Sequence, residues 1–529
     1  MTVETSAVDA AHALDRANTI VRGSDKLLVR LSGIVKAFPN VLANAGIDLE
    51  LCAGEIHGLL GENGSGKSTL MKILYGIYQP DAGSISISGR QVVINSPRDA
   101  VRHGIGMVHQ HFMLVPSLTV VENLMLGIET RRGLLLDREP IRRKTKELFE
   151  RTGLSPVSLD ARTDTLSVGE QQRVEILKAL LRGAKTLVLD EPTAVLTPQE
   201  AERLGEMLLQ LRHSGYGIVL ITHKLDEVTA FCDWVTVLRQ GKNVASRPAR
   251  GISKQELATL MVGRKLTDVG LGDRAPSKEV LLALDGVTVH SRNGKGELDG
   301  VSLAVHSGEI LGIAGVAGNG QGALAEVLVG LRRIDRGTIR VGGVPADDWN
   351  VRRAIREGVG YIPEDRQCIG LVLNLSVEEN LVLKSIERPR FSTCGVIRFR
   401  FIRQHADELI KAFDVRPSIA ISPVRWLSGG NQQKVILARE LAPENRIIVA
   451  AEPTRGLDVG SVDYIHRTLV RQRDKGSGIV LISTDLDEVL RLSDRVAVLY
   501  AGKVVKVLER RTATREVIGL FMAGGSEGN

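Results

Sequence analysis

The sequence lacks several features that would point to membrane-spanning, metal-clustered or base-stacking proteins. It holds no run of about 18 apolar residues, so no membrane-spanning helix is predicted. Aromatic residues make up only 3% of the chain, which disfavours a stacking platform for nucleic-acid bases. CxxC pairs are also absent, which disfavours zinc and iron–sulfur sites and is typical of reduced thiols in a cytosol. The four cysteines stand singly at Cys52, Cys232, Cys368 and Cys394.

Charge of one sign is not in large excess either. The formal net charge of +7 is mild for 529 residues, and it permits contact with nucleic acid or an anionic membrane surface but requires neither. Residues 1–26 carry early acidic side chains and no apolar segment, so a polar extension is predicted there rather than a signal peptide. A chain of this length exceeds one ordinary core and is expected to form about two to four domains.

What the sequence does contain is a repeat of itself. Residues 53–89, AGEIHGLLGENGSGKSTLMKILYGIYQPDAGSISISG, correspond to residues 307–343, SGEILGIAGVAGNGQGALAEVLVGLRRIDRGTIRVGG. Corresponding positions are 254 apart in this region and 261 apart further on, where Glu191 matches Glu452, so the second half carries a net insertion of seven residues. Such a long period predicts two fused homologous domains.

Similar segments close the two halves and set the predicted domain limits. TLMVG ends the first half at Gly263, and GLFMAG ends the second half near the C-terminus. We therefore predict a first domain over 27–263 and a second over 280–524, with a short tail at 525–529. Residues 264–279 are polar and contain Gly and Pro, as expected of a linker.

Within each half the pattern alternates between short apolar runs and helical stretches. EIHGLL and TLVLDEP read as buried strands that end in loops, and GIVLITHKLDEV reads as a strand, a turn and a helix. This alternation predicts an α/β fold with a mainly parallel sheet in each domain. Residues 111–164 are less regular and are predicted to form a mostly helical lobe.

A phosphate-binding loop is predicted where GENGSGKST follows the first of these strands. It fits the pattern G-x-x-x-x-G-K-[ST], in which glycines let successive backbone N–H groups close around phosphate oxygens. Lys67 would reach the β- and γ-phosphates, and Ser68 would bind Mg²⁺. The alternative is a chance match to a loose pattern. The candidate nucleotide contacts are Gly61, Glu62, Asn63, Gly64, Ser65, Gly66, Lys67, Ser68 and Thr69.

A second element of the same chemistry is the acidic pair that ends TLVLDEP. Asp190 could hold the magnesium, directly or through water, and Glu191 could polarise the attacking water as a general base. A strand that ends in a solvated acidic turn is the alternative explanation of the pair alone. Together with the lysine loop, the pair favours a nucleotide phosphatase.

Three further side chains are informative through their order along the chain. Gln110 and His223 each follow an apolar strand, and each could also be an ordinary polar residue at a strand end. Phe38, upstream of the phosphate loop, could stack on an adenine ring, although a single Phe is more often a core residue.

The order of the Lys67 loop, Gln110, LSVGEQQR at 166–173, LVLDEP and His223 resembles the nucleotide-binding domain of ATP-binding cassette (ABC) proteins. The resemblance covers both halves, and it implies two tandem P-loop NTPase domains, each with an antiparallel β region beside the parallel sheet. It also implies ATP and Mg²⁺ as cofactors, with Gln110 joining Ser68 and Asp190 at the metal. In such proteins two domains meet head to tail, so that each ATP lies between one domain's phosphate loop and the other's signature.

By this resemblance, the second half has lost most elements that a domain applies to its own nucleotide. Loss of the lysine removes a charge-assisted contact of about 1.5–3 kcal/mol, although the glutamate is retained as Glu452. The altered pairs are Phe38 and Arg292, Lys67 and Gln321, Ser68 and Gly322, Gln110 and Glu364, Asp190 and Ala451, and His223 and Thr484.

Elements that a domain lends to its neighbour show the opposite distribution. The second half has the standard signature LSGGNQQ and a standard D-loop, whereas the first half has Val168 and Thr197 at positions of a signature glycine and the D-loop aspartate. The resemblance therefore implies one complete composite site and one altered site, which is weak or regulatory. Whether the altered site binds ATP without splitting it is left open. The residues lent to the complete site are Ser428, Gly429, Gly430 and Asp458.

The fused pair with a lysine-less second loop resembles the ATPase of bacterial simple-sugar and nucleoside importers. Residues 104–127 and 361–381 look closest to the nucleoside-uptake branch. That branch implies two membrane permeases, an extracellular substrate-binding lipoprotein or protein, and a peripheral place on the cytoplasmic face of the bacterial membrane. A ribose-, galactose- or xylose-type importer is the alternative within transport.

A non-transport tandem ABC protein that acts on ribosomes or DNA is a less favoured alternative, because the linker is short, one site is altered and CxxC pairs are missing. No nucleic acid is therefore expected as a partner. Residues 111–115 are candidates for permease contact, with interior packing as the alternative. Residues 388–403, RPRFSTCGVIRFRFIR, could touch a permease or lipid head groups, or could form a solvated amphipathic helix.

Overall fold

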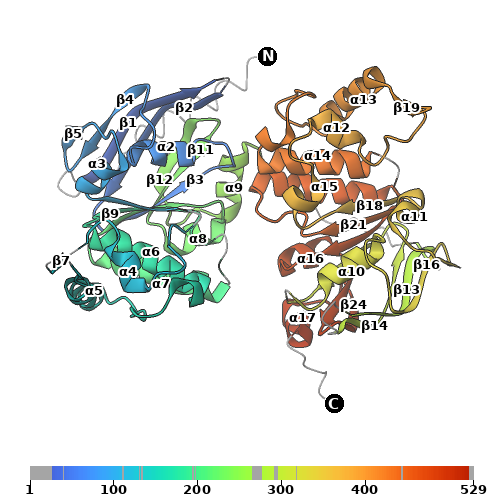
Figure 1. Cartoon of the computed structure of the whole chain (residues 1–529). Helices are drawn as coiled ribbons and strands as arrows, with labels where there is room; N and C mark the ends of the chain where they lie inside the picture. The colour runs from blue at the N-terminus through green and yellow to red at the C-terminus, as the bar shows by residue number, and fades with distance from the viewer. Residues whose placement is uncertain are drawn as a thin grey trace. The chain divides into compact units, whose positions relative to one another are not determined.

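A computed structural model describes two compact units, Met1–Leu266 and Thr267–Asn529 (Figure 1). The division falls inside the predicted linker 264–279, and the finer domain limits stay a prediction. None of the described helices is both long and apolar enough to cross a bilayer. The described residues are 27–39, 41–109, 112–129, 131–132, 135–193, 196, 198–264, 277–290, 296–316, 318–442 and 445–522.

The first unit is built on a six-stranded sheet in the order β12-β11-β3-β10-β9-β6. All neighbouring pairs are parallel except β11 and β12, which pair antiparallel. β3 and β10 are buried along their whole length. β10 is apolar throughout, and β3 is apolar except for His57, whose ring nitrogens contact Glu55 and Thr236. The strands span Ile56–Leu60 (β3), Ile105–Val108 (β6), Thr186–Asp190 (β9), Gly217–Ile221 (β10), Trp234–Arg239 (β11) and Lys242–Pro248 (β12).

An antiparallel sheet in the order β2-β1-β4-β5 completes the β structure around the core of this unit. Helix α2, Lys67–Leu74, contributes Leu70, Met71, Ile73 and Leu74 to a core shared by both sheets. The phosphate loop is therefore held between a buried strand and a buried helix. The antiparallel strands span Leu27–Phe38 (β1), Val41–Cys52 (β2), Ala82–Ile87 (β4) and Arg90–Val92 (β5).

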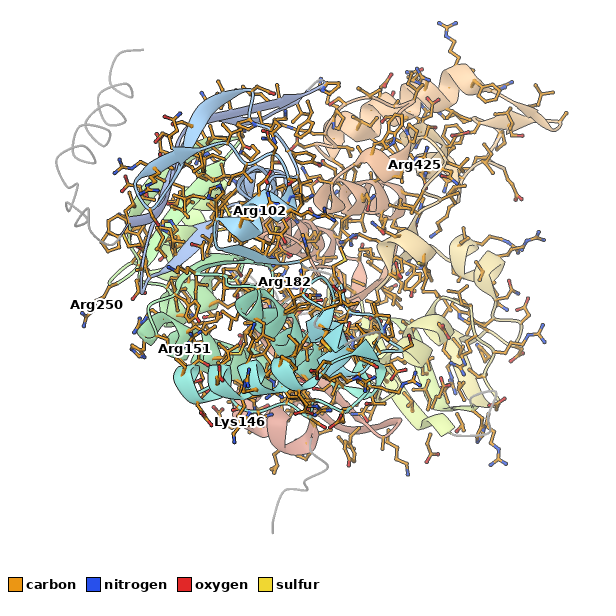
Figure 2. The ribbon with its side chains drawn as sticks, turned by 60° about the vertical axis from the view of Figure 1, so that its left-hand side comes forward. Arg102, Lys146, Arg151, Arg182, Arg250 and Arg425 are labelled. Atoms are coloured by element: carbon orange, nitrogen blue, oxygen red, sulfur yellow. The ribbon has the colours of Figure 1, made fainter. Side chains whose placement is uncertain are left out.

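The helical lobe predicted over 111–164 packs on a second core, which it shares with α6, α7 and strands of the six-stranded sheet. A short hairpin, β7 (Arg131–Arg132) with β8 (Leu135–Leu136), directly precedes helix α5. The helices of the unit are α3 (Pro97–Arg102), α4 (Val120–Met125), α5 (Glu139–Thr152), α6 (Val168–Leu181), α7 (Pro198–His213), α8 (Leu225–Phe231) and α9 (Lys254–Val262). Labelled cations in this unit come from several elements rather than one, namely Arg102, Lys146, Arg151, Arg182 and Arg250 (Figure 2).

The second unit repeats this architecture, with sheets in the orders β18-β21-β22-β15-β23-β24 and β14-β13-β16-β17. Its strands are Val280–His290 (β13), Gly296–His306 (β14), Ile310–Ala314 (β15), Arg336–Val341 (β16), Val344–Pro345 (β17), Val359–Ile362 (β18), Ile447–Ala451 (β21), Gly478–Ile482 (β22), Arg495–Tyr500 (β23) and Lys503–Glu509 (β24). Its helices are α10 (Gln321–Leu328), α11 (Val351–Arg356), α12 (Val377–Val382), α13 (Phe399–Ala412), α14 (Gly429–Leu441), α15 (Val459–Asp474), α16 (Leu486–Leu492) and α17 (Arg515–Met522). The predicted α/β class, with parallel and antiparallel sheets and a helical lobe in each half, is confirmed.

The seven-residue insertion of the second unit is divided between two places. Thr119 and Ser376 both cap the helix that follows with a capping box, and they are 257 positions apart. Three inserted residues therefore precede Ser376, near a single turn of π-helix at Arg366–Gly370. The other four lie between Ser376 and Pro423, because Pro423 pairs with Ser376 as Arg162 pairs with Thr119. A hairpin of β19 (Ser392–Thr393) and β20 (Val396–Ile397) lies in this second stretch.

Corresponding ion pairs in the two units give a stability prediction. Arg473, only 1% exposed, donates from Nε and Nη2 to the carboxylate of Asp494 at 3.0 and 2.7 Å. The matching Arg212 and Asp233 are 25% and 40% exposed and share one bond of 2.8 Å. Because Arg473→Ala leaves the largely buried carboxylate of Asp494, 11% exposed, without its main partner, we expect it to lower the free energy of unfolding by about 3 kcal/mol.

Arg212→Ala is the matched control, with an expected loss of about 1 kcal/mol or less because water replaces the exposed partner. Urea unfolding of the full chain, followed by tryptophan fluorescence, measures both losses. Equal losses would contradict the role assigned to burial.

Candidate functional site

The phosphate loop of the first unit runs from the end of β3 to the start of α2. A Cβ on Gly61 would lie 2.3 Å from the Leu238 carbonyl oxygen, and a Cβ on Gly66 would lie 2.4 Å from the Ala43 carbonyl oxygen. Both glycines also have positive φ angles, of 152° and 103°. Larger residues are therefore excluded both by the close contacts of a Cβ and by the backbone conformation. The loop geometry therefore depends on glycine at these two positions.

Lys67 places its ammonium group against the inside of this loop. The side chain is buried, and Nζ donates hydrogen bonds to the carbonyl oxygens of Gly61 at 2.7 Å and Glu62 at 2.9 Å. A cation held at the N-terminus of α2, beside the loop N–H groups, is the arrangement that binds phosphate.

Ser68 and Asp190 supply two oxygen atoms close to Lys67. The Ser68 hydroxyl donates to Asp190 Oδ1 at 3.5 Å. Burial, together with the neighbouring charge of Glu191, raises the pKa of Asp190. A hydroxyl and a carboxylate side by side fit Mg²⁺, which binds through a few protein oxygens and completes its coordination with phosphate and water.

Glu191 and His223 meet at the carboxyl ends of neighbouring strands. Asp190 of β9 pairs with Ile221 of β10, so the residues just beyond each strand approach one another. Glu191 has a φ of 47°, and its Oε1 lies 3.1 Å from His223 Nδ1. The hydrogen bond to His223 is the main cause that lowers the pKa of Glu191, and the same bond fixes the position of the carboxylate.

At the corresponding loop of the second unit, the lysine is replaced by an amide with a similar contact. Gln321 Nε2 donates to the Val316 carbonyl oxygen at 2.9 Å, as Lys67 does to the carbonyl of Glu62. Gln321 thus preserves one bond inside the loop but supplies no charge. Sequence comparison shows the loss of the lysine but not this substitute contact.

Glu452, the counterpart of Glu191 in the second unit, has the same backbone conformation but different hydrogen-bond partners. Its φ is 46°, and its Oε1 accepts a hydrogen bond from the Thr484 N–H at 2.7 Å. Burial raises the pKa of Glu452, whereas the hydrogen bond to His223 lowers that of Glu191. The preceding Ala451 is buried and has no side-chain oxygen for a metal. The second unit therefore keeps the carboxyl group but lacks the neighbouring aspartate and histidine of the first-unit site.

Other predicted positions have mixed outcomes. Phe38 is not a core residue, since it is 36% exposed, and it contacts the Tyr78 ring edge to face at 5.3 Å between centroids. Tyr78 was not identified from the sequence. Glu364 of the second unit forms an exposed ion pair with Arg455. Gln110, His111, Thr197 and Arg292 lie outside the described residues.

The two signature segments begin their helices in different ways. Ser167 is held in a capping box, in which Ser167 Oγ accepts from the Glu170 N–H at 3.3 Å and Glu170 accepts from the Ser167 N–H at 3.0 Å. Among the described residues, no backbone N–H of α14 donates to the Ser428 hydroxyl oxygen, which instead accepts from the side-chain Nδ2 of Asn431 in the same helix at 2.9 Å. The Ser428 hydroxyl is thus bonded to a side chain of its helix rather than to the helix backbone.

The second-unit signature and D-loop are packed together. A Cβ on Gly430 would lie 2.4 Å from Ser461 Oγ, and Asp458 caps α15 by accepting from the Ser461 N–H at 2.8 Å. The structure therefore brings Gly430 and Asp458 to one place, where only glycine fits beside the first turn of α15.

Arg366 is a residue of this region that the sequence did not reveal. A Cβ on Gly429 would lie 3.1 Å from Arg366 Nη2, and Arg366 Nη1 donates to the Arg455 carbonyl oxygen at 2.8 Å. The guanidinium therefore joins the signature to the loop that precedes Asp458. The first unit has Val168 at the position of Gly429, and Val168 is 37% exposed. The position of Arg366 near the inserted residues is the one sequence feature that could have drawn attention to it.

The ABC transporter family model matches residues 45–194 and 298–455, one segment in each unit. The chain belongs to the ABC transporter family. The predicted family resemblance and the tandem ABC domains are thereby confirmed. The chain is an ATPase and binds ATP, as the ABC domains of this family do.

Curated ABC relatives cover nearly the whole chain. The Nucleoside import ATP-binding protein NupA of Lactococcus lactis subsp. cremoris is 43% identical over 95% of this chain and 99% of its own length. The Guanosine import ATP-binding protein NupO of Bacillus subtilis is 44% identical over 94% of this chain and 98% of its own. The Ribose import ATP-binding protein RbsA 1 of Rubrobacter xylanophilus is 43% identical over 94% and 98%.

A solved structure of the archaeal ribosome recycling factor aABCE1, in complex with the ribosomal stalk protein aP1, is similar over 95% of this chain and 92% of its own. Its TM-score is 0.57 and its identity 21%, so this likeness concerns the fold alone.

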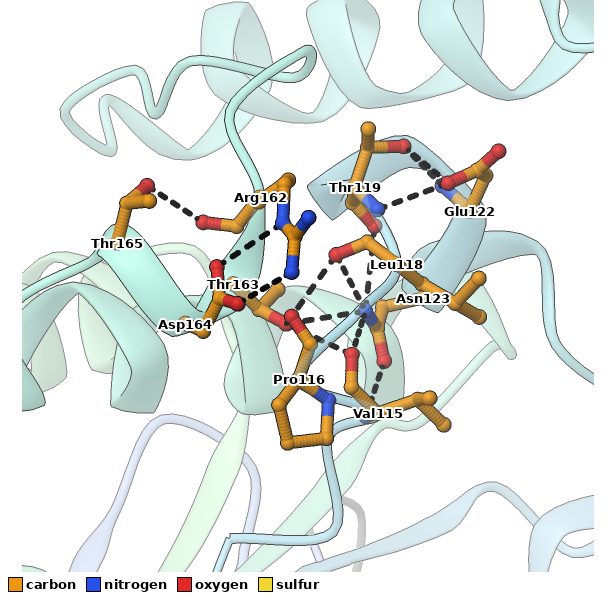
Figure 3. Close-up of polar contacts among 10 residues, drawn as sticks. All are labelled: Val115, Pro116, Leu118, Thr119, Glu122, Asn123, Arg162, Thr163, Asp164 and Thr165. Carbon is orange, nitrogen blue, oxygen red and sulfur yellow. Dashed lines mark hydrogen bonds and ion pairs between the residues drawn. The ribbon is translucent and has the colours of Figure 1, made fainter.

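The loop that follows Gln110 in this ABC protein is fixed by a buried asparagine. Asn123 Oδ1 accepts from the Val115 N–H at 2.8 Å, while Nδ2 donates to several carbonyl oxygens, among them those of Val115 and Thr119 (Figure 3). Thr163, which precedes the signature, donates to the Val115 carbonyl oxygen at 2.8 Å. The loop and the signature segment are therefore joined by hydrogen bonds.

Side chains of this loop point in two directions. Met113 and Val115 are 63% and 39% exposed, whereas Leu114 packs against the helical core. The Met113 backbone is held by α6, since its N–H donates to Glu175 at 2.8 Å and its carbonyl accepts from Lys178 at 3.1 Å. Interior packing therefore explains Leu114 but not Met113, and contact with a permease stays a prediction.

A separate cleft of about 420 Å³ opens at the amino ends of β9 and β10, opposite the end where Glu191 and His223 meet. Leu28, Lys185 and Tyr216 line it together with Arg151, which is labelled in Figure 2 and donates to the Tyr216 hydroxyl at 2.8 Å. None of its lining residues belongs to the predicted nucleotide site.

Proposed function

We propose that this chain is the ATP-hydrolysing subunit that energises an importer of nucleosides. The names of the relatives NupA and NupO support this cargo class. The observation that carries the proposed mechanism is geometric: in the first unit Ser68 contacts Asp190 and Glu191 contacts His223, whereas Ala451 and Thr484 stand at the positions of Asp190 and His223 in the second unit.

The proposed working site combines two sets of residues. The first unit supplies the loop 61–69 with Phe38, and the second unit supplies Ser428, Gly429, Gly430 and Asp458 to the same ATP. This pairing follows from the family resemblance and the distribution of altered motifs, and the close packing of Gly430 with Asp458 supports it. The residues proposed to act on the γ-phosphate, the metal and the water are Lys67, Ser68, Gln110, Asp190, Glu191 and His223.

In the proposed mechanism, phosphoryl transfer to water occurs when the two units close on ATP. Lys67 and the loop N–H groups offset charge on the γ-phosphate, and His223 contacts the same group. Glu191 orients the attacking water and accepts its proton. Mg²⁺ bound by Ser68, Asp190 and Gln110 would supply further neutralisation of phosphate charge. Ser428 and the adjacent backbone N–H groups complete the enclosure only in the closed state.

The proposed partners are two membrane permeases and an extracellular substrate-binding lipoprotein or protein. The chain would then lie peripherally on the cytoplasmic face of the cell membrane, with residues 111–115 as candidate permease contacts. The exposure of Met113 and Val115 supports this docking.

Import of ribose or a related sugar is the second candidate, because a ribose import relative is as similar as the nucleoside relatives. Uptake of labelled guanosine and of labelled ribose, in cells with and without the gene, separates the two. We expect deletion to abolish guanosine uptake, restoration by the wild-type gene, and no restoration by Glu191→Gln. Loss of ribose uptake alone would support the second candidate, and unchanged uptake of both would contradict import of either.

A further inference from the structure

The second unit carries an exposed apolar surface that the ATPase chemistry does not use. It comprises residues 388–401, the β19–β20 hairpin with the start of α13, and is termed here the Arg–Phe hairpin (Figure 1). Val396 and Ile397 are 68% and 43% exposed, and Phe399 and Phe401 are 71% and 41% exposed. Four large apolar side chains within six residues thus face solvent.

Positive charge surrounds these apolar side chains. Arg388, Arg390, Arg398 and Arg400 lie within the hairpin, which contains no acidic residue. Arg390 lies 3.6 Å from Glu408, but in the described part of the chain no carboxylate pairs with the other three arginines. The Arg398 guanidinium lies 5.6 Å from the centre of the Phe401 ring. The surface therefore combines apolar rings with a net positive charge.

The hairpin is held in place by a small apolar core and by backbone hydrogen bonds. Phe391 is 3% exposed and packs with Val382 and Ile402 in a small core. The Arg398 N–H donates to the Phe391 carbonyl oxygen at 2.8 Å, which closes the base of the hairpin. Cys394 and Gly395 form its turn with φ angles of 50° and 79°. Because the base is fixed, the apolar side chains are held outward.

We propose that the Arg–Phe hairpin binds the surface of an anionic lipid membrane. Interleaved aromatic and cationic side chains suit the boundary between acyl chains and phosphate head groups. Arginine can keep its guanidinium at phosphate level while its stem lies along apolar groups, and anionic lipids attract each such cation. The absence of acidic residues from the hairpin favours an anionic lipid surface over a protein surface of mixed charge.

The first unit has a hairpin at the corresponding position, which supports a shared membrane-facing role. β7 and β8 stand directly before α5, as β19 and β20 stand before α13. Leu136 of β8 is 61% exposed and corresponds to Ile397. Acidic residues, Asp137 and Glu139, follow it, so the second unit is expected to bind the lipid more strongly. This contact requires no permease and is independent of the cargo.

Sedimentation of the purified full chain with vesicles tests the proposal. We expect binding to vesicles that contain phosphatidylglycerol, weak binding to phosphatidylcholine alone, and weaker binding as salt screens the charge. Arg398→Gln with Arg400→Gln should weaken binding about 25-fold, at about fivefold for each arginine. Phe399→Ser should weaken it about tenfold by removing buried apolar area.

The matched control changes an exposed valine and an exposed arginine elsewhere in the same unit, as Val344→Ser with Arg511→Gln. This control should bind vesicles as the wild type does, and all variants should hydrolyse ATP at the wild-type rate. An environment-sensitive dye on Cys394, in a Cys368→Ser background, should shift to the blue on anionic vesicles. Lack of binding, equal binding to both lipids, binding unaffected by the hairpin variants, or binding without the dye shift would each overturn the proposal.

Discussion

Lys67→Ala is expected to reduce ATP turnover by about 100- to 1000-fold, the range for loss of a preorganised donor to developing charge. The buried ammonium lies inside the phosphate loop and donates to the Gly61 and Glu62 carbonyls, so its removal takes positive charge from the γ-phosphate position. Steady-state phosphate release by the purified full chain measures this loss.

Gln321→Ala is the matched control for that change. Gln321 makes one neutral bond within its own loop, to the Val316 carbonyl oxygen, so turnover should stay within about threefold of wild type. Equal damage from Lys67→Ala and Gln321→Ala would mean that both loops support hydrolysis, contrary to the proposed single site.

The second large effect is expected at the proposed general base. Glu191→Gln should lower turnover by about 100- to 10,000-fold, the usual contribution of a positioned acid or base. The amide keeps the shape of the side chain and can still contact His223, but it cannot accept the proton of the attacking water. ATP affinity, measured with a fluorescent ATP analogue, should change little because the phosphate loop is intact.

Glu452→Gln provides the comparison within the same molecule. Glu452 shares the backbone conformation of Glu191, but Ala451 replaces the aspartate before it, and it accepts from the Thr484 backbone N–H where Glu191 contacts the His223 ring. Turnover by this variant should therefore remain near that of the wild type. A loss similar to that of Glu191→Gln would show that the second carboxylate also acts in hydrolysis.

The strands and loops that hold the first-unit site could be predicted from the sequence. Short, mostly apolar runs and their flanking loops indicated β3, β9 and β10, because strands covered on both faces carry mainly apolar residues. The motif order indicated, through the family resemblance, that the Lys67 loop, Asp190, Glu191 and His223 serve one nucleotide site. The contact between Glu191 and His223, and its effect on the pKa of Glu191, required the structure.

Contacts made by inserted or distant residues could not be predicted in this way. The Arg366 guanidinium lies close to Gly429, and no local pattern in the sequence shows that a side chain from another segment would make a tight contact with a Cβ there. The hydrogen bond from the Gln321 side-chain amide to Val316 and the raised pKa of Glu452 likewise depend on tertiary surroundings. From the sequence alone, only the net length of the insertion could be predicted. The capped helix starts at Thr119 and Ser376 are equivalent points in the structure, and they show that the inserted residues lie in two places.

We assign the Ser428 hydroxyl to the ATP bound by the first unit, and substitution of the two signature serines, Ser428 and Ser167, tests this assignment. Measured side by side as phosphate release by the full chain, Ser428→Ala should reduce turnover by about 10- to 100-fold, the range for a lost hydrogen bond to a charged group. Ser167→Ala removes a helix cap from the other signature and should leave turnover within about threefold. A greater loss from Ser167→Ala than from Ser428→Ala would contradict the account.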